Sequence, residues 1–572
     1  MMTSLVRDLI TSLFTISILL GGFAQAQAGD PPPPSPTWPA PSAPGGPGSD
    51  AGDGDLVPIG VIAQTSPAAA VVAASRKQMQ VVDLSQTLQE SSTFYPSLFP
   101  GMNADALPVQ PRDALEFGRK IFPGGTPFGF DPASGSTAAS ITTGEHTGTH
   151  MDAPNHFIGS GGDIAGHAVE RLACPLAVID IRDQARGNSK LPITRDMVVA
   201  WEAENGSIPD GAMVCILTGY EHSAGDKETH HPGFTVQAAD YMRRERRISG
   251  VGTDSLSPDI SGDLSFPVHK RLLGDQCMIL ENLRNLDAVP ANGASVLMAP
   301  LAISAGSGSP TRVVAFVGTA PAGEFEVRDL THRLDGQTPF LDGSDPTFRP
   351  PEKPLLGGLG EEVSKGLKLP KIKLPKIDLG GLIPGKPVMR ETTARTMING
   401  YYGGYFQMGV STGTHIDFPR RSQSGGDDAA SYQLARLFGG AVVVDMRDVP
   451  QRSTMNAESL QQRLAGRSVS GAYLVLWTGR SDNRHPGLTA DAATWAMSQS
   501  ARGILTDAAD IDPASARNRP AERAVHEAYG VTGGFLRDPG QLPASGATLA
   551  ILPMPVARSP SAPARILAYL PR

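Results

Sequence analysis

A fourteen-residue stretch, GEHTGTHMDAPNHF, concentrates side chains that bind metal ions in other proteins. It begins at Gly144 and contains His146, His150, Asp152 and His156. The intervening glycines and threonines make a poor helix, so we expect an extended backbone, in which every second side chain points the same way. All four residues stand at even positions and would share one face. Two imidazoles and a carboxylate are a common ligand set for catalytic zinc or a related divalent ion.

The alternative interpretation is a group of hydrogen-bonded loop histidines without a metal. A single histidine would favour that alternative, but three histidines and an aspartate in one register favour a metal site. A divalent ion lowers the pKa of a bound water from about 15.7 toward about 7 and so provides hydroxide at neutral pH. A nearby histidine, which titrates close to neutrality, can then move protons.

The remaining sequence is organised by an internal repeat. Four stretches of the first half have similar counterparts in the second half, in the same order: VVDLSQTL and VRDLTHRL, LAVIDIRD and AVVVDMRD, VGTDSLSPD and ILTDAADID, and SPTRVVAFV and APARILAYL. A His-Pro-Gly unit recurs as well, at His231 and His485, and we interpret it as a shared structural turn. Ordered landmarks of this kind predict two tandem domains, which we place at 76–322 and 323–572. Short β-branched runs alternate with helical stretches in each, which predicts an α/β fold.

The metal-binding phrase also resembles a known family signature. HTGTHMDAPNHF is similar to the His-x-Gly-Thr-His-x-Asp-x-Pro-x-His-Phe motif of the cyclase family of metal-dependent hydrolases, which includes bacterial kynurenine formamidases and isatin hydrolases. DLSQTL, VGTDSLSPD and HKRLLGDQCMILENLRNL resemble later landmarks of that family. The resemblance implies a swivelling β/β/α-like fold in each of the two tandem cyclase-type domains.

The same resemblance implies an activity and a set of site residues. The expected reaction is hydrolysis of an amide, formamide, cyclic amide or lactone bond, with one or two divalent ions per chain, zinc or manganese. His156 would be the general acid and base, and its alternatives are a metal ligand or a structural histidine. The implied metal ligands are His146, His150, Asp152, His269 and Glu281.

The second copy departs from this pattern. In its echo, GVSTGTHIDFPRRS, Ser411 stands in the place of His146 and Arg421 in the place of His156, while His415 and Asp417 keep the middle pair. Serine is a poor metal ligand, and arginine cannot act as a base near neutral pH. His526 is the candidate counterpart of His269, and no glutamate stands near Gly534, where Glu281 would fall. We therefore expect a catalytically inactive second domain.

The bulk composition narrows the class of partner. The 572 residues are 40% hydrophobic and 19% charged, with a net charge of -8 and a pI near 5.9. This acidic balance lacks the cationic excess that binding to nucleic acid requires, so we expect a small-molecule substrate. Three dispersed cysteines match neither a disulfide framework nor a zinc spacing and are expected to be buried thiols.

Targeting and linker segments are expected at the N-terminus and within the second copy. Residues 1–28 combine a weak positive start, an apolar run and the small-residue sequence AQAQA, which predicts a cleaved signal peptide rather than a membrane anchor. The mature protein would then be exported, periplasmic or extracellular, without an integral membrane segment. Residues 29–75 are interpreted as a Pro/Gly-rich linker, and about 352–390 as an insertion with a repeated Leu-Pro-Lys-Ile unit.

Two classes of function follow from these observations. The first is an exported metal-dependent hydrolase with its active site in the first copy. The second is a non-catalytic binding or scaffold protein that keeps the fold. The resemblance implies assembly as dimers or larger symmetric oligomers, so we expect the fused second copy to replace a partner subunit, giving a pseudo-dimer within the chain that can also assemble further as a homo-oligomer.

Overall fold

The computed structural model describes residues 67–88, 140–220, 230–318 and 405–572, except for single positions at 264, 424 and 517, together with short pieces at 129–131, 136–138, 325–329, 331, 334, 396–398 and 401–403. The predicted signal peptide at 1–28, most of the predicted linker and the insertion at 352–390 lie outside these residues. Within the described part of the chain, no helix has both the length and the hydropathy needed to span a bilayer.

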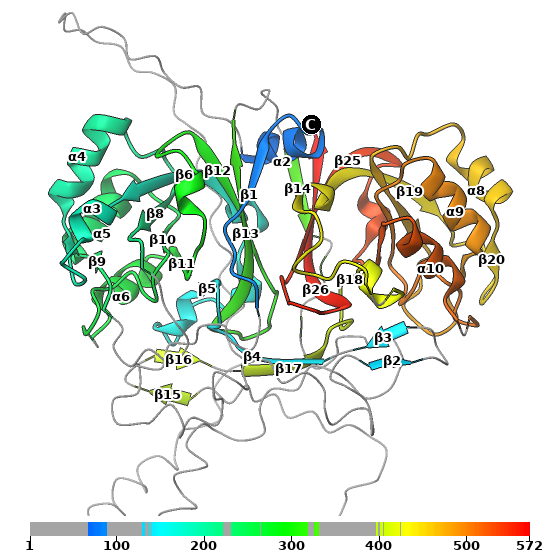
Figure 1. The fold of residues 1–572 in the computed structure, drawn as a ribbon, viewed down its shortest axis with the longest axis horizontal. Helices are drawn as coiled ribbons and strands as arrows, with labels where there is room; N and C mark the ends of the chain where they lie inside the picture. The colour runs from blue at the N-terminus through cyan, green and yellow to red at the C-terminus, as the bar shows by residue number, and fades with distance from the viewer. Residues whose placement is uncertain are drawn as a thin grey trace, which may run out of the picture. The chain divides into compact units, whose positions relative to one another are not determined.

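The first copy is built on a mixed sheet that closes on itself (Figure 1). Its central strands run parallel, and β13 pairs at one edge with β12 and at the other with β5, which closes a ring of seven strands. An eighth strand, β1 (Gln80–Asp83), adds to β13 outside this ring. In order around the ring the strands are β13 (Gly308–Val317), β12 (Ala294–Pro300), β6 (Ala173–Asp180), β8 (Met213–Leu217), β10 (Gly250–Thr253), β11 (Met278–Glu281) and β5 (His150–Asp152).

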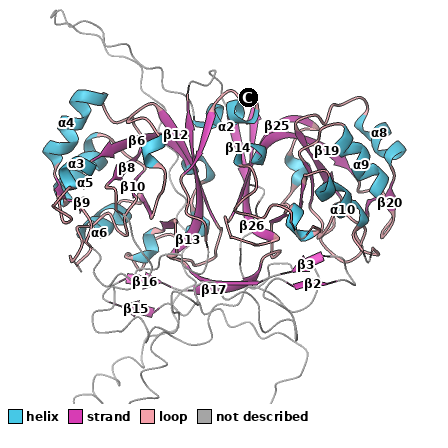
Figure 2. Cartoon of the chain, in the orientation of Figure 1, coloured by secondary structure: helices cyan, strands magenta, loops and turns pink. Residues whose placement is uncertain are grey.

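Helices cover one side of this ring (Figure 2). Two of them begin at hydroxyl caps: Thr194 accepts from the backbone N–H of Met197, and Thr235 accepts from that of Ala238. The three longer helices each bury an apolar face against the parallel strands in a common core. The helices are α3 (Arg182–Ala185), α4 (Arg195–Asn205), α5 (Val236–Glu245) and α6 (Pro267–Gly274), and a small parallel pair, β7 (Pro192–Ile193) and β9 (Gly233–Phe234), connects them.

The second copy repeats this arrangement, except that α3 has no helical counterpart among its described residues. Its ring closes where β26 pairs with both β18 and β25, and β14 (Phe325–Asp329) adds to β26 as β1 does to β13. The ring contains β26 (Ser561–Pro571), β18 (His415–Asp417), β24 (Val531–Gly534), β23 (Gly503–Thr506), β21 (Ala472–Trp477), β19 (Phe438–Asp445) and β25 (Ser545–Pro553). Its helices are α8 (Ala457–Leu464), α9 (Ala490–Ser498) and α10 (Pro520–Glu527), with the pair β20 (Thr454–Met455) and β22 (Gly487–Leu488).

A buried arginine–aspartate ion pair joins equivalent strands in the two copies. Arg312 on β13 pairs with Asp83 on β1, and Arg565 on β26 pairs with Asp329 on β14 at 2.6 Å. Both arginine side chains are almost fully buried, so each needs its carboxylate. The predicted α/β class and the tandem duplication are confirmed.

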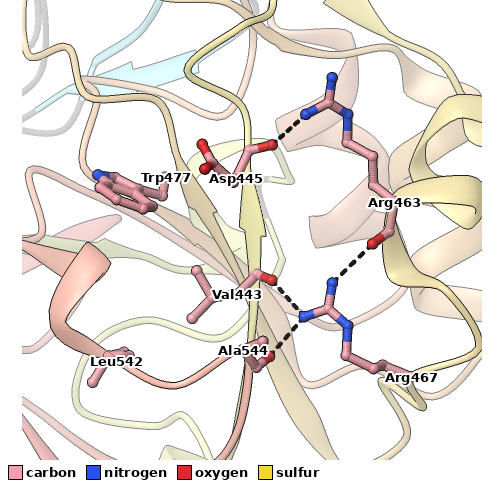
Figure 3. A pocket seen from close by; sticks show the side chains of 7 residues that line it. All are labelled: Val443, Asp445, Arg463, Arg467, Trp477, Leu542 and Ala544. Carbon is pink, nitrogen blue, oxygen red and sulfur yellow. Dashed lines mark hydrogen bonds between the residues drawn. The ribbon is translucent and has the colours of Figure 1, made fainter.

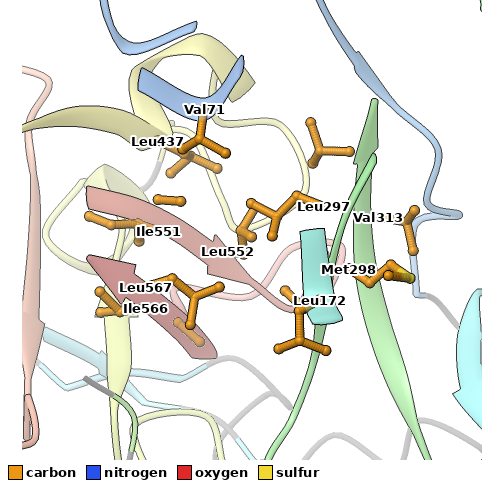
Figure 4. Close-up of a cluster of buried hydrophobic side chains, with 14 of the residues drawn as sticks. Val71, Leu172, Leu297, Met298, Val313, Leu437, Ile551, Leu552, Ile566 and Leu567 are labelled. Carbon is orange, nitrogen blue, oxygen red and sulfur yellow. The ribbon is translucent and has the colours of Figure 1, made fainter. Parts of the chain in front are cut away.

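The two copies share one hydrophobic core. Strands β12 and β13 of the first copy and β25 and β26 of the second contribute buried side chains, such as Leu297 and Leu552, to the same cluster (Figure 4). In this cluster Phe316 meets Phe438 edge to face, with ring centroids 5.5 Å apart. A short apolar helix, α2 (Pro67–Ser75), packs against strands of both copies. Its residues fall within the range predicted as linker, 29–75, and that prediction is wrong for them, because an alanine- and valine-rich segment gains more from burial than from solvation.

Short arms also cross between the copies. The strand that precedes the metal-binding phrase, β4 (Ser140–Gly144), pairs antiparallel with its own counterpart, β17 (Tyr405–Gly409). The hairpin β15 (Thr396–Ile398) with β16 (Tyr401–Gly403) belongs to the second copy, yet β16 lies against the first copy at Pro154–His156. Reciprocally, the hairpin β2 (Gly129–Asp131) with β3 (Ser136–Ala138) reaches the second copy at Pro419–Arg421. Each copy therefore places a hairpin against the other copy, at the end of the metal-binding phrase or of its counterpart.

Candidate metal centre

The metal-binding phrase does not form one extended strand. Only His150–Asp152 is a strand, β5, which places His150 and Asp152 on one face. Before it the chain turns at Gly148, whose φ of 60° is left-handed and whose missing Cβ leaves room for Leu88. After it a 3₁₀ turn, η3 (Pro154–His156), follows. The prediction of a single period-2 face is thus wrong, and two turns bring the outer histidines back toward the strand.

Asp152 lies at the centre of the cluster. Its Oδ1 is 2.8 Å from Nδ1 of His146 and 3.4 Å from Nε2 of His150, while its Oδ2 is 3.2 Å from Nε2 of His269. The Asp152 side chain is almost completely buried. One carboxylate therefore faces imidazoles on both of its sides.

Glu281 bridges the same two sides. It is the last residue of β11 and stands opposite His150 in the antiparallel pairing with β5. Its Oε2 is 3.1 Å from Nε2 of His150, and its Oε1 is 3.2 Å from Nε2 of His269. The structure thus brings together all five residues that the resemblance implies as metal ligands, although the last two are over a hundred residues from the phrase.

The histidines are oriented by groups behind them. Nδ1 of His150 lies 2.9 Å from the carbonyl oxygen of Gly148, and Nδ1 of His269 lies 2.6 Å from Oδ2 of Asp259. Asp259 also accepts the backbone N–H groups of Val268 and His269 at the start of α6. In both histidines Nε2 is left facing the carboxylates. This arrangement, in which a second group fixes the tautomer, is usual behind metal-binding histidines.

His146 is held from both ring nitrogens. Its Nε2 lies 2.9 Å from Oγ of Ser307, and Ser307 in turn donates its hydroxyl to Oε2 of the buried Glu145 at 2.5 Å. The next residue, Gly308, must lack a side chain, since a Cβ there would lie 2.5 Å from Cε1 of His146. Glu145, Ser307 and Asp259 were not predicted from sequence, although Glu145 and Asp259 both stand within repeated stretches.

His156 closes the cluster from η3. Its ring stacks on that of His146, with centroids 4.0 Å apart, and lies 6.1 Å from that of His269. One ring nitrogen is within 4.8 Å of ligand atoms of Asp152 and His269. His156 is therefore placed both to exchange a proton within the cluster and to serve as a ligand, and the two roles stay open on geometry alone.

The electrostatics of the cluster favour positive charge. Burial would raise the pKa of Asp152, but the charges of His156 and His146 and hydrogen bonds from the histidines hold it well below its usual value. Burial likewise opposes a charged His269, but hydrogen bonds to Asp152, Asp259 and Glu281 raise its pKa well above its usual value. A buried carboxylate with a lowered pKa attracts any available cation, whether a proton or a metal ion.

The donor set fits a divalent metal. His146, His150 and Asp152 form one group of converging ligand atoms, and Asp152, His156 and His269 form another, each within 4.8 Å. Among the described residues, Asp152 and Glu281 form ion pairs with imidazoles alone, so no lysine or arginine neutralises them. Mixed imidazole and carboxylate ligands suit zinc, manganese and related ions.

Other polar residues in the repeat have structural roles. Nδ1 of His231 lies 3.1 Å from the carbonyl oxygen of Pro232, and His485 repeats this contact with Pro486 at 3.2 Å, as expected for a shared turn. Asp254 accepts the backbone N–H and the hydroxyl of Thr218. The three cysteines are buried and unpaired, as predicted.

A hollow of about 300 Å³ in the second copy is unrelated to the cluster (Figure 3). It is lined partly by Arg463 and Arg467, which would suggest an anion site. However, Arg467 donates to the carbonyl oxygens of Val443 and Ala544, and Arg463 pairs with Asp448 at 2.7 Å. Both arginines are therefore already paired with groups of the protein itself.

Among its described residues, the second copy has no equivalent cluster of imidazoles. His526 was predicted as the counterpart of His269, and this is wrong. Asp512 caps α10 as Asp259 caps α6, and it accepts the backbone N–H groups of Ala521 and Glu522. Glu522 therefore stands in the place of His269, whereas His526 lies one helical turn further on.

Comparison with known proteins agrees with this geometry. The Cyclase family model matches residues 82–260 and again 328–513, which together exceed half of the chain. The chain belongs to the cyclase family. The predicted fold, two tandem cyclase-type α/β domains, is therefore confirmed, and the family match in both halves agrees with a pseudo-dimer within the chain.

Relatives in the cyclase family include hydrolases. The chain is 39% identical over 198 residues to an isatin hydrolase of Roseibium aggregatum, covering 32% of this chain and 74% of the relative. It is 29% identical over 199 residues to a kynurenine formamidase of Bacillus cereus, covering 34% of this chain and 89% of the relative. Among solved structures, isatin hydrolase A from Ralstonia solanacearum is 33% identical, with a TM-score of 0.37, and the match covers 44% of this chain and 96% of that one.

The contacts of Ser307 lead to a first prediction. Ser307→Ala removes the hydroxyl that links His146 to Glu145 and frees the imidazole to rotate. We expect metal affinity to fall about 10- to 100-fold, the usual effect of losing a group that orients a ligand, without loss of folding. Titration with zinc against a competing chelator measures this. Ser309→Ala, two residues further along the chain on β13, is the control. Equal metal affinity in wild type and Ser307→Ala would contradict the orienting role of Ser307.

Proposed function

We propose that the first copy is an exported metal-dependent hydrolase that cleaves the C–N bond of an amide, formamide or cyclic amide, or the C–O bond of a lactone. The observation that carries this proposal is the convergence of three imidazoles and two carboxylates around Asp152, buried and without a neutralising lysine or arginine among the described residues. The hydrolase relatives support the reaction class. The apolar run within residues 1–28 supports export.

The chain's own residues define how the site would work. His146, His150, Asp152, His269 and Glu281 would hold one or two ions, zinc or manganese. When bound, such an ion supplies hydroxide near neutral pH and polarises a carbonyl group.

His156 is proposed as the general acid and base. It would receive the proton of the attacking water and return it to the leaving nitrogen or oxygen, and its stacking on His146 fixes the ring beside the cluster. The hairpin of β15 and β16 from the second copy lies against η3 and supports a role for the second copy in covering this residue.

The test is a metal analysis of the purified mature protein with a hydrolase screen on aryl formamides, cyclic amides and lactones. We expect one or two metal ions per chain and turnover of at least one substrate class. His156→Ala should lower kcat about 10²- to 10⁴-fold while the metal content stays constant. Exposed His230 provides the control, His230→Ala.

The outcomes separate the alternatives for this site. A His156→Ala variant that loses metal identifies His156 as a ligand instead of the acid and base. Metal binding with no turnover across the screen indicates a binding protein that keeps the fold. Absence of both metal and turnover contradicts the proposed function.

A further inference from the structure

A buried arginine occupies the centre of the second copy's signature site. Arg421 belongs to the 3₁₀ turn η7 (Pro419–Arg421), and its side chain is 2% exposed. Nη1 donates to Oδ1 of Asp417 at 3.1 Å, to Oγ of Ser411 at 2.9 Å and to Oγ of Ser561 at 2.9 Å. Nε donates to Oε1 of Glu522 at 3.0 Å. The guanidinium is thus surrounded by oxygen atoms.

These oxygen atoms come from the positions that form the metal cluster in the first copy. The sheet registers align the two sites, since Asp417 lies opposite Ser561 as Asp152 lies opposite Gly308. The equivalent pairs, first copy then second, are His146 and Ser411, Asp152 and Asp417, His156 and Arg421, His269 and Glu522, Glu281 and Gly534, and Gly308 and Ser561.

The replacements compensate one another. A side chain at Gly308 would collide with His146, but the shorter Ser411 leaves room for Ser561, which donates its hydroxyl to Asp417. Gly534 stands at the position of Glu281 and provides no carboxylate, but Glu522, at the position of His269, provides one. Each site therefore keeps two buried carboxylates. Random loss of single ligands would not preserve both the charge and the packing.

We propose that the guanidinium of Arg421 takes the place of a metal ion, so that the second copy is held together by an internal cation and binds no metal. Oδ1 of Asp417 already accepts from Arg421 and Ser561, and Glu522 is paired with Arg421. A divalent ion at this position would meet the fixed positive charge, and among the described residues one imidazole, that of His415, pairs with the Asp417 carboxylate. The inference concerns the second copy and stands apart from the proposed activity of the first.

The first test locates the bound metal. Full-length protein is equilibrated with Zn²⁺, and separately with Mn²⁺, desalted and analysed by inductively coupled plasma mass spectrometry. His150→Ala with Asp152→Asn should reduce the metal content to zero, whereas the matched pair His415→Ala with Asp417→Asn should leave it as in wild type. Metal that remains in the first variant and disappears when the second pair is added overturns the inference.

The second test measures the role of the charge and holds even if the wild type binds no metal. Arg421→Met keeps most of the side-chain volume but removes the cation shared by Asp417 and Glu522, and leaves Glu522 only the more distant Arg519 at 4.0 Å. The midpoint of urea unfolding should fall by on the order of 1 M, equally with and without EDTA. Arg421→Met combined with Asp417→Asn and Glu522→Gln should recover at least half of that loss. An unchanged midpoint in the single variant, or no recovery in the triple variant, overturns the inference.

Discussion

Asp152→Asn is expected to remove the bound metal and to lower kcat/KM by about a thousandfold or more. Both oxygens of Asp152 face imidazoles, Oδ1 toward His150 and Oδ2 toward His269, so it contributes to either side of the cluster. Asparagine keeps the shape but loses the charge and one of the two oxygens. Because a catalytic metal supplies several kcal/mol and each tenfold in rate corresponds to about 1.36 kcal/mol, the loss spans several orders of magnitude.

The duplication provides a matched control for this variant. Asp417→Asn changes the same residue of the same motif on the equivalent strand, β18, but in the second copy. It should leave metal content and turnover unchanged while lowering stability, since Arg421 loses a charged partner. Metal analysis and steady-state kinetics on both variants measure the contrast. Equal losses of activity in the two variants would place a required site in each copy and contradict an inactive second domain.

The isolated first copy is expected not to form an active monomer. Residues 67–318 alone would expose the side of β12 and β13 that now packs against β25 and β26, and β4 would lose its partner strand β17. Exposed apolar surface of this kind leads to aggregation or pairing. Light scattering on the purified fragment measures its mass, and the hydrolase assay measures its activity.

The comparison that decides this prediction is between the fragment and the fragment co-expressed with residues 319–572. We expect co-expression to restore a soluble, active complex, because α2 and the crossing arms contact both copies. A fragment that is monomeric, stable and as active as the whole chain would show that the second copy is dispensable.

Much of the fold could be predicted because its signals are local. Short apolar runs form strands such as β8, Met213–Leu217, and Thr194 and Thr235 cap the starts of α4 and α5, in keeping with the predicted alternation. The repeat could be recognised because each of its landmarks is an uninterrupted stretch of sequence. Helix α2 was missed because a run of seven alanines and valines after a proline-rich leader has no periodic pattern of its own, and only the shared core shows why these residues are buried.

The site could be predicted only in part, because its residues come from segments that are far apart in the sequence. The ligand types were visible, but their convergence depends on the left-handed turn at Gly148 and on pairing between β5 and β11, which spacing does not encode. Ser307 and Glu145 act through hydrogen bonds between distant segments. His526 was matched to His269 by residue type, whereas the cap at Asp512 shows that position along the helix decides the equivalence.

The antiparallel ribbon of β4 and β17 has a consequence for how this molecule can vary. In a symmetric homodimer every substitution appears twice, so a change in the arm that covers one site also appears in the arm that covers the other. Here the two strands of the ribbon are encoded separately, and so are the hairpins that cross between the copies. A mutation in β16, which lies against η3, can therefore alter the surroundings of His156 without any matching change in the first copy.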